Sequence, residues 1–417
     1  MSIIKDILAR EILDSRGHPT PEVKVILQSG VVGISSVPSG ASVGKYEALE
    51  LRDNDPKRYQ QKGVLKSIEK ITAVIKPRLL GLNARDQLKI DQTLISLDDS
   101  PRKEHLGANS TLGASQAVCK AAANFEKIPL YLHISHLYGA AGDFKIPTPI
   151  FNLINGGKHG AGNLDFQEFH LIPAETKSFS QSLQLGVEVY HQLRNVLIRN
   201  QASHAVGDEG GFAPNLLTNQ DALEALKAAI TEAGYTFKKD VFLGLDLAAN
   251  TFYVDNKYSI KDSTTPLTPD ELMDIYSQLV NNYGLVSLED PFFEDDWRSW
   301  SKLTSLFPLV LIIGDDLLAT SKQRVEEAIE KKACSAILVK PNQIGTIGET
   351  IEVIKTARKA NWKTVISHRS GETTDDFIAD FAVGVHSDFC KFGAPARGER
   401  VVKYNRLLEI ESELKHV

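Results

Sequence analysis

The chain has 417 residues, of which 42% are hydrophobic and 24% are charged, and this composition excludes a disordered, collagen-like or disulfide-stapled protein. Its 47 Lys and Arg residues against 53 Asp and Glu residues give a formal net charge of −6 without long runs of one sign, which argues against nucleic acid as a direct partner. The start of the chain lacks the basic and apolar regions of a signal peptide, and no apolar run approaches the roughly 18 residues of a membrane span, so we expect a cytoplasmic protein.

The first third of the chain has the pattern of an α+β domain. Apolar runs at 23–27 and around Ile34 predict strands, and the stretches 56–69 and 109–128 predict helices. A breaker-rich stretch from 139 to 149 indicates a linker. Because a length prior of about 150 residues per domain allows two or three domains, we expect a capping domain over residues 1–138 and a second domain over residues 139–417.

Short apolar runs then alternate with long amphipathic stretches, which is the pattern of repeated βα units. The runs lie at 150–154, 166–172, 241–247, 285–288, 309–313, 336–339, 364–366 and around Phe389. Eight strands in about 250 residues match a (β/α)8 barrel of the TIM type. Only about a dozen residues separate the first two runs, too few for a crossover helix, so the α/β barrel is predicted to open with a β-hairpin. A doubly wound open sheet is the alternative.

Charged residues end six consecutive runs of this predicted barrel. They are Asp246, Glu289, Asp315, Lys340, His368 with Arg369, and Lys391. Catalytic groups lie at the carboxyl ends of barrel strands, so we expect these side chains to converge on one face. Three neighbouring carboxylates repel one another unless a cation neutralises them. The pattern therefore predicts an oxygen-ligated ion, Mg²⁺ before Ca²⁺, with positions left open for water and substrate.

Single acidic residues after a strand usually cap a helix or lie in a solvated turn. This interpretation suits Asp290, Asp316 and the pair Asp295 and Asp296. Lys340 is the candidate general base, because a nearby metal ion and a second lysine should lower the pKa of its ammonium group. A lysine whose stem covers apolar surface at a strand end is the structural alternative.

Other residues indicate anion binding and proton transfer. Lys391, and Arg369 beside Ser370, suit a phosphate or carboxylate group. Glu168, next to Gln167 in the second strand, and Glu209, in the glycine-rich loop 207–211, form a second acidic set. Two glutamates that share a site raise one pKa, and the protonated acid can then serve a leaving group.

Two glycine-containing segments are predicted to be flaps over the site. Residues 38–44 are small, and the loop 155–162 carries His159. The second loop is not a phosphate-binding P-loop, because Lys158 is followed by a histidine and the GxxxxGK[ST] spacing is absent.

Eight motifs in the same order resemble those of the enolase family, the phosphopyruvate hydratases. They are LDSRG at 13–17, SGAS at 39–42, FQEF at 166–169, GDEGGF at 207–212, LED at 288–290, GDDL at 314–317, NQIGT at 342–346 and SHRSGET at 367–373. The resemblance extends over almost the whole chain. It implies reversible, Mg²⁺-dependent dehydration of 2-phosphoglycerate to phosphoenolpyruvate, the glycolytic reaction.

The resemblance also implies a role for each matching position. The implied metal ligands are Asp246, Glu289 and Asp315 for a first Mg²⁺, and Ser42 for a second Mg²⁺ that arrives with the substrate. The implied catalytic residues are Lys340 as the base, Glu209 as the acid, and Glu168, His159 and His368 beside them. The implied substrate-binding residues are Gln167, Arg369, Ser370, Lys391 and His159. The family further suggests a homodimer or an octamer built as a ring of dimers, and a secondary role at the cell surface for some members.

Two other functions stay open at this point. Another carboxylate-enolising enzyme of the superfamily, a racemase or an acid-sugar dehydratase, would use the same barrel, although Arg369, Ser370 and Lys391 suit a phosphate. A non-catalytic binding protein would retain the fold without the chemistry, although the charged residues are all present.

Overall fold

The chain begins with a three-stranded antiparallel sheet. Its strands β1 (Ile4–Leu13), β2 (Pro19–Leu27) and β3 (Val32–Ser36) pair in the order β1–β2–β3. In β2 every second side chain from Val23 to Leu27 is fully buried, which gives the sheet one apolar face. The computed structural model describes residues 1–40, 44–140, 142–160 and 164–415.

Helices cover that apolar face. They are α1 (Leu65–Lys70), continued by the π turn η2 (Ile71–Ile75) into α2 (Lys76–Leu79), then α3 (Gln87–Leu97) and α4 (Ala108–Glu126). The next helix, α5 (Leu130–Tyr138), packs against α4 and a helix of the barrel instead. Helix α4 lies closest to the sheet, because Gly33 leaves no side chain in the way. A Cβ at Gly33 would lie 2.1 Å from the carbonyl oxygen of Ala117.

The helix predicted over 109–128 is confirmed as α4, but the one over 56–69 is wrong in its first half. Residues Tyr59, Gln60 and Gln61 have φ between 44° and 73°, the left-handed region that an α-helix cannot contain. Only a short 3-10 turn η1 (Tyr59–Gln61) forms there, and the α-helix begins at Leu65.

The rest of the chain forms a nearly closed, mostly parallel barrel. Its strands are β4 (Thr148–Pro149), β5 (Phe151–Asn155), β6 (Glu168–Pro173), β7 (Val241–Asp246), β10 (Ser287–Glu289), β11 (Leu311–Gly314), β12 (Ala336–Val339), β13 (Lys363–Ser367) and β14 (Phe389–Lys391). They pair in the order β4–β14–β13–β12–β11–β10–β7–β6–β5. A small hairpin of β8 (Tyr253–Val254) and β9 (Lys257–Tyr258) lies outside this sheet.

The strand order confirms the predicted barrel and its opening hairpin. Strands β5 and β6 pair antiparallel, and β6 also pairs antiparallel with β7, whereas β7 and the strands after it are parallel. The doubly wound open sheet is wrong, because an open sheet of that kind reverses its strand order partway, and this one runs sequentially around the barrel.

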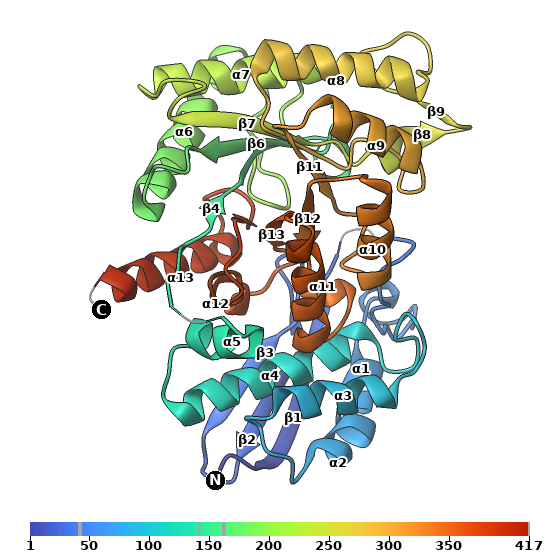
Figure 1. Cartoon of the computed structure of the whole chain (residues 1–417), viewed down its shortest axis with the longest axis vertical. Helices are drawn as coiled ribbons and strands as arrows, with labels where there is room; N and C mark the ends of the chain where they lie inside the picture. Colours follow the sequence, from blue (N-terminus) through green and yellow to red (C-terminus); the bar gives the residue numbers. More distant parts are fainter. Residues whose placement is uncertain (41–43, 141, 161–163, 416–417) are drawn as a thin grey trace.

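Helices surround the barrel (Figure 1). They are α6 (Phe179–Arg199), α7 (Asn219–Glu232), α8 (Pro269–Tyr283), α9 (Trp297–Leu306), α10 (Lys322–Lys331), α11 (Ile347–Lys359), α12 (Phe377–Gly384) and α13 (Gly398–Lys415). Several begin at reciprocal caps. At α6, the side chain of Ser178 accepts from the N–H of Gln181, and the side chain of Gln181 accepts from the N–H of Ser178.

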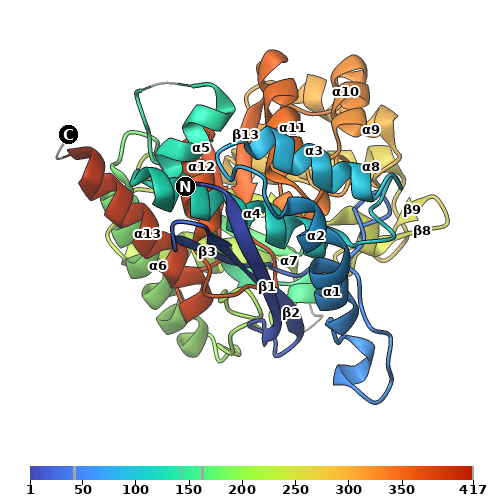
Figure 2. The same cartoon turned by 90° about the horizontal axis from the view of Figure 1, so that it is seen from below.

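The capping domain packs against one end of the barrel, as Figure 2 shows with β1 and β2 in front of the barrel helices. The contact at the barrel mouth is a short antiparallel pairing. The N–H of Ser39 donates to the carbonyl of Gly371 at 2.7 Å, and the N–H of Gly371 donates back at 2.9 Å. Over the described residues, none of the helices combines the length and the apolar character needed to cross a membrane.

Candidate active site

A cavity of about 250 Å³ opens at the carboxyl ends of the barrel strands. The predicted site residues that line it are His159, Gln167, Glu168, Glu209, Asp246, Asp315, Lys340, His368, Arg369, Ser370 and Lys391. Gly44, Lys45 and Glu47 of the capping domain line its other side. The predicted ligand Ser42 lies outside the described residues. The charged strand ends therefore converge on one face, as the barrel requires.

The ammonium group of Lys391 lies among three buried carboxylates. Its Nζ is 2.9 Å from both carboxylate oxygens of Glu289, 3.3 Å from Asp246 and 3.1 Å from Glu168. Burial favours the neutral amine, but the three carboxylates outweigh it and raise the pKa of Lys391. Asp246 and Glu289 end the neighbouring strands β7 and β10 in register. Burial raises the pKa values of both carboxyl groups, with a further rise from the charge of Glu168 at Asp246 and from the charge of Asp246 at Glu289.

Asp315 is held by a different lysine. Lys340 Nζ donates to Asp315 Oδ2 at 2.5 Å, and Gln343 Nε2 donates to Oδ1 at 3.3 Å. Although burial favours the neutral amine, the charge of Asp315 raises the pKa of Lys340. The predicted fall of this pKa is therefore not produced by the residues of the chain, because the neighbouring carboxylate outweighs the repulsion from Arg369 and Lys391.

Two acidic sets within the described ranges have ligand atoms that all lie within 4.8 Å of one another: His159 with Glu168 and Glu209, and Asp290 with Asp315 and Asp316. The predicted set of Asp246, Glu289 and Asp315 is not one of them. Lys391 contacts the first two carboxylates and Lys340 contacts the third. Its chemistry nevertheless fits Mg²⁺. All the donors are carboxylate oxygens, and the raised pKa values of Asp246 and Glu289 show negative charge that a cation would stabilise.

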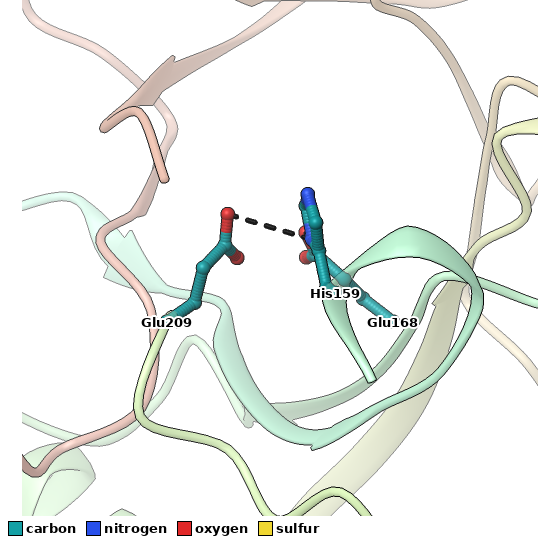
Figure 3. Close-up of side chains that lie close together, drawn as sticks. All are labelled: His159, Glu168 and Glu209. Carbon is teal, nitrogen blue, oxygen red and sulfur yellow. Dashed lines mark hydrogen bonds and ion pairs between the residues drawn. The ribbon is translucent and has the colours of Figure 1, made fainter. Parts of the chain in front are cut away.

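The other two glutamates of the cavity, Glu168 and Glu209, both contact histidines. His159, at the end of the 3-10 turn η3 (Gly157–His159), lies between Glu168 and Glu209 (Figure 3). Its Nδ1 is 3.2 Å from Glu168 Oε1 and 3.5 Å from Glu209 Oε1. Burial opposes a charge on His159, but the two carboxylates raise its pKa to about 9. His170 contacts the second oxygen of Glu168 at 2.9 Å.

Glu209 is surrounded by donors. Ser370 Oγ donates to its Oε1 at 2.8 Å and Asn152 Nδ2 to its Oε2 at 2.9 Å, and His368 Nε2 lies 3.4 Å from Oε2. Burial and the charge of Glu168 raise the pKa of Glu209, but His159 and His368 outweigh them and hold it below its ordinary value. The predicted raised pKa of one glutamate is therefore wrong for this arrangement, since the shared proton is on His159.

The guanidinium of Arg369, the candidate anion-binding group, already forms a hydrogen bond with Glu47, which the sequence did not predict as a site residue. Arg369 Nη1 donates to Glu47 Oε2 at 2.9 Å and to Asn342 Oδ1 at 3.1 Å. Glu47 comes from the capping domain and is buried. The sequence shows that Glu47 follows the predicted flap 38–44, but it does not show that Glu47 pairs with Arg369. Gln167, also predicted, donates to Asp246 at 3.2 Å.

The prediction that Asp290 caps a helix or lies in a solvated turn is wrong. Its buried carboxylate accepts the N–H groups of Asp315 at 2.9 Å and Asp316 at 2.7 Å, and so supports the end of β11. Asp316 lines the cavity, where burial and Asp315 raise its pKa to about 7. The interpretation is confirmed for Asp296, which caps α9 by accepting from the N–H of Ser299.

An α+β capping domain over a TIM-type barrel, with carboxylates and lysines at successive strand ends, is the architecture of a superfamily of lyases and racemases. Family models agree: residues 4–134 match the enolase N-terminal domain and residues 143–417 match the enolase C-terminal TIM barrel domain. The chain belongs to the enolase family. This family generally uses Mg²⁺, in keeping with the acidic clusters of the cavity.

Proposed function

We propose that this protein is a phosphopyruvate hydratase, which reversibly dehydrates 2-phosphoglycerate to phosphoenolpyruvate in a Mg²⁺-dependent reaction. The observation that carries the proposal is the division of the cavity. Lys340 lies on one side, with Asp315, and Glu209 lies on the other, with His159. A reaction that removes a proton from one carbon and a hydroxide from the next needs a base and an acid placed in this way.

Lys340 is the proposed base. Its neutral amine would take the proton from the carbon next to the substrate carboxylate, which places a second negative charge on that group. Its short hydrogen bond to Asp315 keeps it protonated in the chain itself, so the base forms when the charge of Asp315 is shared with another cation. Asp246, Glu289 and Asp315 are the proposed holders of one Mg²⁺, and Ser42 of a second. Bound Mg²⁺ supplies positive charge that stabilises the developing dianion.

Glu209 is the proposed acid for the leaving hydroxide. Its carboxylate is 3.5 Å from His159, which carries a proton at neutral pH. That proton can move to Glu209 and then to the departing oxygen, which leaves as water. Glu168 assists by contacting the same Nδ1 atom of His159 at 3.2 Å, which stabilises the positive charge of the ring. General acid and base catalysis each contribute about 10²–10⁴-fold.

The anionic groups of the substrate have their own proposed partners. Arg369 and Ser370 would hold the phosphate, because a guanidinium binds such oxygens with two parallel hydrogen bonds. Lys391 and Gln167, which also line the cavity, would hold the carboxylate. These groups favour a phosphorylated acid over the unphosphorylated acids that racemases and acid-sugar dehydratases use.

The test is a turnover assay with purified protein. With 2-phosphoglycerate and Mg²⁺, we expect the enol absorbance of phosphoenolpyruvate to rise. Glycerate, which lacks the phosphate, is the matched control and should give no product. Turnover of an unphosphorylated acid sugar or racemisation of a carboxylic acid, without any reaction of 2-phosphoglycerate, would contradict the proposal. Absence of turnover with all of these substrates would favour the non-catalytic binding role.

We also propose a domain organisation, an assembly state and a location for this protein. We propose domains over residues 1–138 and 139–417, a homodimer or octamer, and a cytoplasmic site of action, as is usual for glycolytic members of this family. Sedimentation equilibrium of the full chain measures the assembly directly.

A further inference from the structure

Arg400, near the start of α13, holds together two loops of the proposed active site. Its side chain is completely buried. Nη1 donates to the carbonyl of Arg369 at 2.6 Å, and Nη2 donates to the carbonyl of Asp208 at 3.0 Å and to that of Ser370. One guanidinium thus joins the loop that carries Glu209 to the loop after β13.

The same guanidinium also contacts the ring of His368. Nη1 lies 2.7 Å from His368 Nδ1. A guanidinium is protonated at all relevant pH values and can only donate. Nδ1 must therefore accept with its lone pair, and the ring proton of a neutral His368 must be on Nε2.

The Nε2 atom faces the cavity beside Glu209. It lies 3.4 Å from Glu209 Oε2 and, among the described residues, makes no hydrogen bond, although it is buried. Burial and the positive charge of Arg400 outweigh the attraction of Glu209 and lower the pKa of His368, which favours the neutral ring. A buried N–H without a close acceptor, directed at a catalytic carboxylate, is available to a substrate oxygen.

Packing keeps the ring in this orientation. Gly393, at φ +87°, lies against both His368 and Arg400. A Cβ at this position would lie 2.9 Å from His368 Cε1 and 3.1 Å from Arg400 Cδ. No other residue fits there without displacing the pair.

We infer that Arg400 is a positioning residue that fixes His368 as the Nε2–H tautomer and directs this N–H at the oxygen that leaves the substrate. The identity of that oxygen rests on the proposed function, whereas the tautomer does not. In the reaction His368 keeps its proton and donates a hydrogen bond, while Glu209 supplies the proton that converts the departing hydroxide to water.

The experiment is ¹⁵N NMR of the full-length protein labelled at histidine, with the His368 signals assigned from the His368→Gln variant. At pH 7 we expect a protonated Nε2 and an unprotonated Nδ1 in the wild type. Arg400→Met should mix the two tautomers and lower kcat by about 10- to 100-fold, with KM nearly unchanged. A loss of this size is typical when a hydrogen-bond partner that orients a metal-binding histidine is removed. Arg400→Lys, which restores a cationic donor, should recover the wild-type tautomer and most of kcat.

Arg397→Met is the matched control. Arg397 donates to the carbonyl of Gly207 at 2.9 Å, on the same loop as the Asp208 contact, but it does not contact His368. Its loss should leave the His368 signals unchanged, which separates the tautomer effect from a general loosening of the loop.

A wild-type His368 that carries its proton on Nδ1, or on both nitrogens, overturns the inference, and this readout does not depend on a variant that folds. An unchanged tautomer in folded Arg400→Met also overturns it. If the tautomer responds as expected but 2-phosphoglycerate is not turned over, the proposed function fails and the assignment of Arg400 to His368 stands.

Discussion

The two sides of the cavity neutralise their carboxylates in different ways. The lysine wall consists of Asp246, Glu289 and Asp315 with Lys340 and Lys391, and the histidine wall consists of Glu168 and Glu209 with His159 and His368. Lys391 also contacts Glu168 at 3.1 Å and so joins the two walls. Neighbouring carboxylates raise the pKa of each lysine, so the lysine wall keeps its positive charges at any physiological pH. Histidines exchange protons much closer to neutral pH. In the protein itself the lysine wall therefore holds its charge, and Lys340 becomes a base only when another cation shares the charge of Asp315, whereas the histidine wall can transfer a proton near neutral pH.

The two histidines of the histidine wall differ in the direction of their pKa shifts. The pKa of His159 is raised to about 9, whereas that of His368 is lowered, although both contact Glu209. His159 has carboxylates on two sides, and His368 has the guanidinium of Arg400 behind it. One glutamate thus has a charged and a neutral imidazole as neighbours, a difference that each neighbour's own partners produce.

Removal of divalent cations should have the largest effect. With excess EDTA we expect the proposed activity to be lost and then restored by Mg²⁺, because the carboxylates of the lysine wall carry more negative charge than its two lysines balance. Turnover of 2-phosphoglycerate before and after chelation is the measurement. Full activity in EDTA would mean that the two lysines alone suffice, and the proposed metal site would be wrong.

The Lys340→Ala substitution should have the second-largest effect on the proposed activity. We expect exchange of the α-proton with solvent to fall by about 10²–10⁴-fold, because no other group of the lysine wall is free to act as a base. Deuterium incorporation into 2-phosphoglycerate measures this exchange. Lys45→Ala is the control, since Lys45 also lines the cavity but pairs with Asp295 at 3.0 Å. Exchange that persists in Lys340→Ala would rule out Lys340 as the base.

Glu209→Gln should slow dehydration while it spares proton exchange. The amide keeps the shape of the side chain but cannot deliver a proton, so we expect about a 10²-fold loss of phosphoenolpyruvate formation. Measured on the same sample, α-proton exchange should stay within a few-fold of the wild type. An equal loss of both steps would show that the two walls do not act separately.

The titration of His159 is the smallest effect and the sharpest test of the histidine wall. A pKa raised from 6.5 to about 9 means that the stabilisation from this ion pair is complete below pH 6.5 and is lost as the pH rises through 9. An NMR titration of the His159 ring should have its midpoint near 9. A midpoint near 6.5 would show that the two carboxylates do not stabilise a charged His159 at neutral pH.

The barrel and the convergence of its charged strand ends were predictable, because strand ends of a parallel barrel meet whatever their partners are. The protonation states were not, because they depend on contacts between distant segments. Lys340 and Asp315 are 25 positions apart, and Glu47 is 322 positions from Arg369. Arg400 had no recognisable motif at all, and its importance comes only from the carbonyls and the ring that α13 brings to it.

The short pairing between Ser39 and Gly371 has a consequence for how such proteins evolve. It joins the start of the predicted flap 38–44 of the capping domain to the barrel loop that carries Arg369 and Ser370. An insertion or deletion on either side would shift both segments together. A capping domain taken from a relative would therefore keep this site intact only if its own segment paired with Gly371 in the same register.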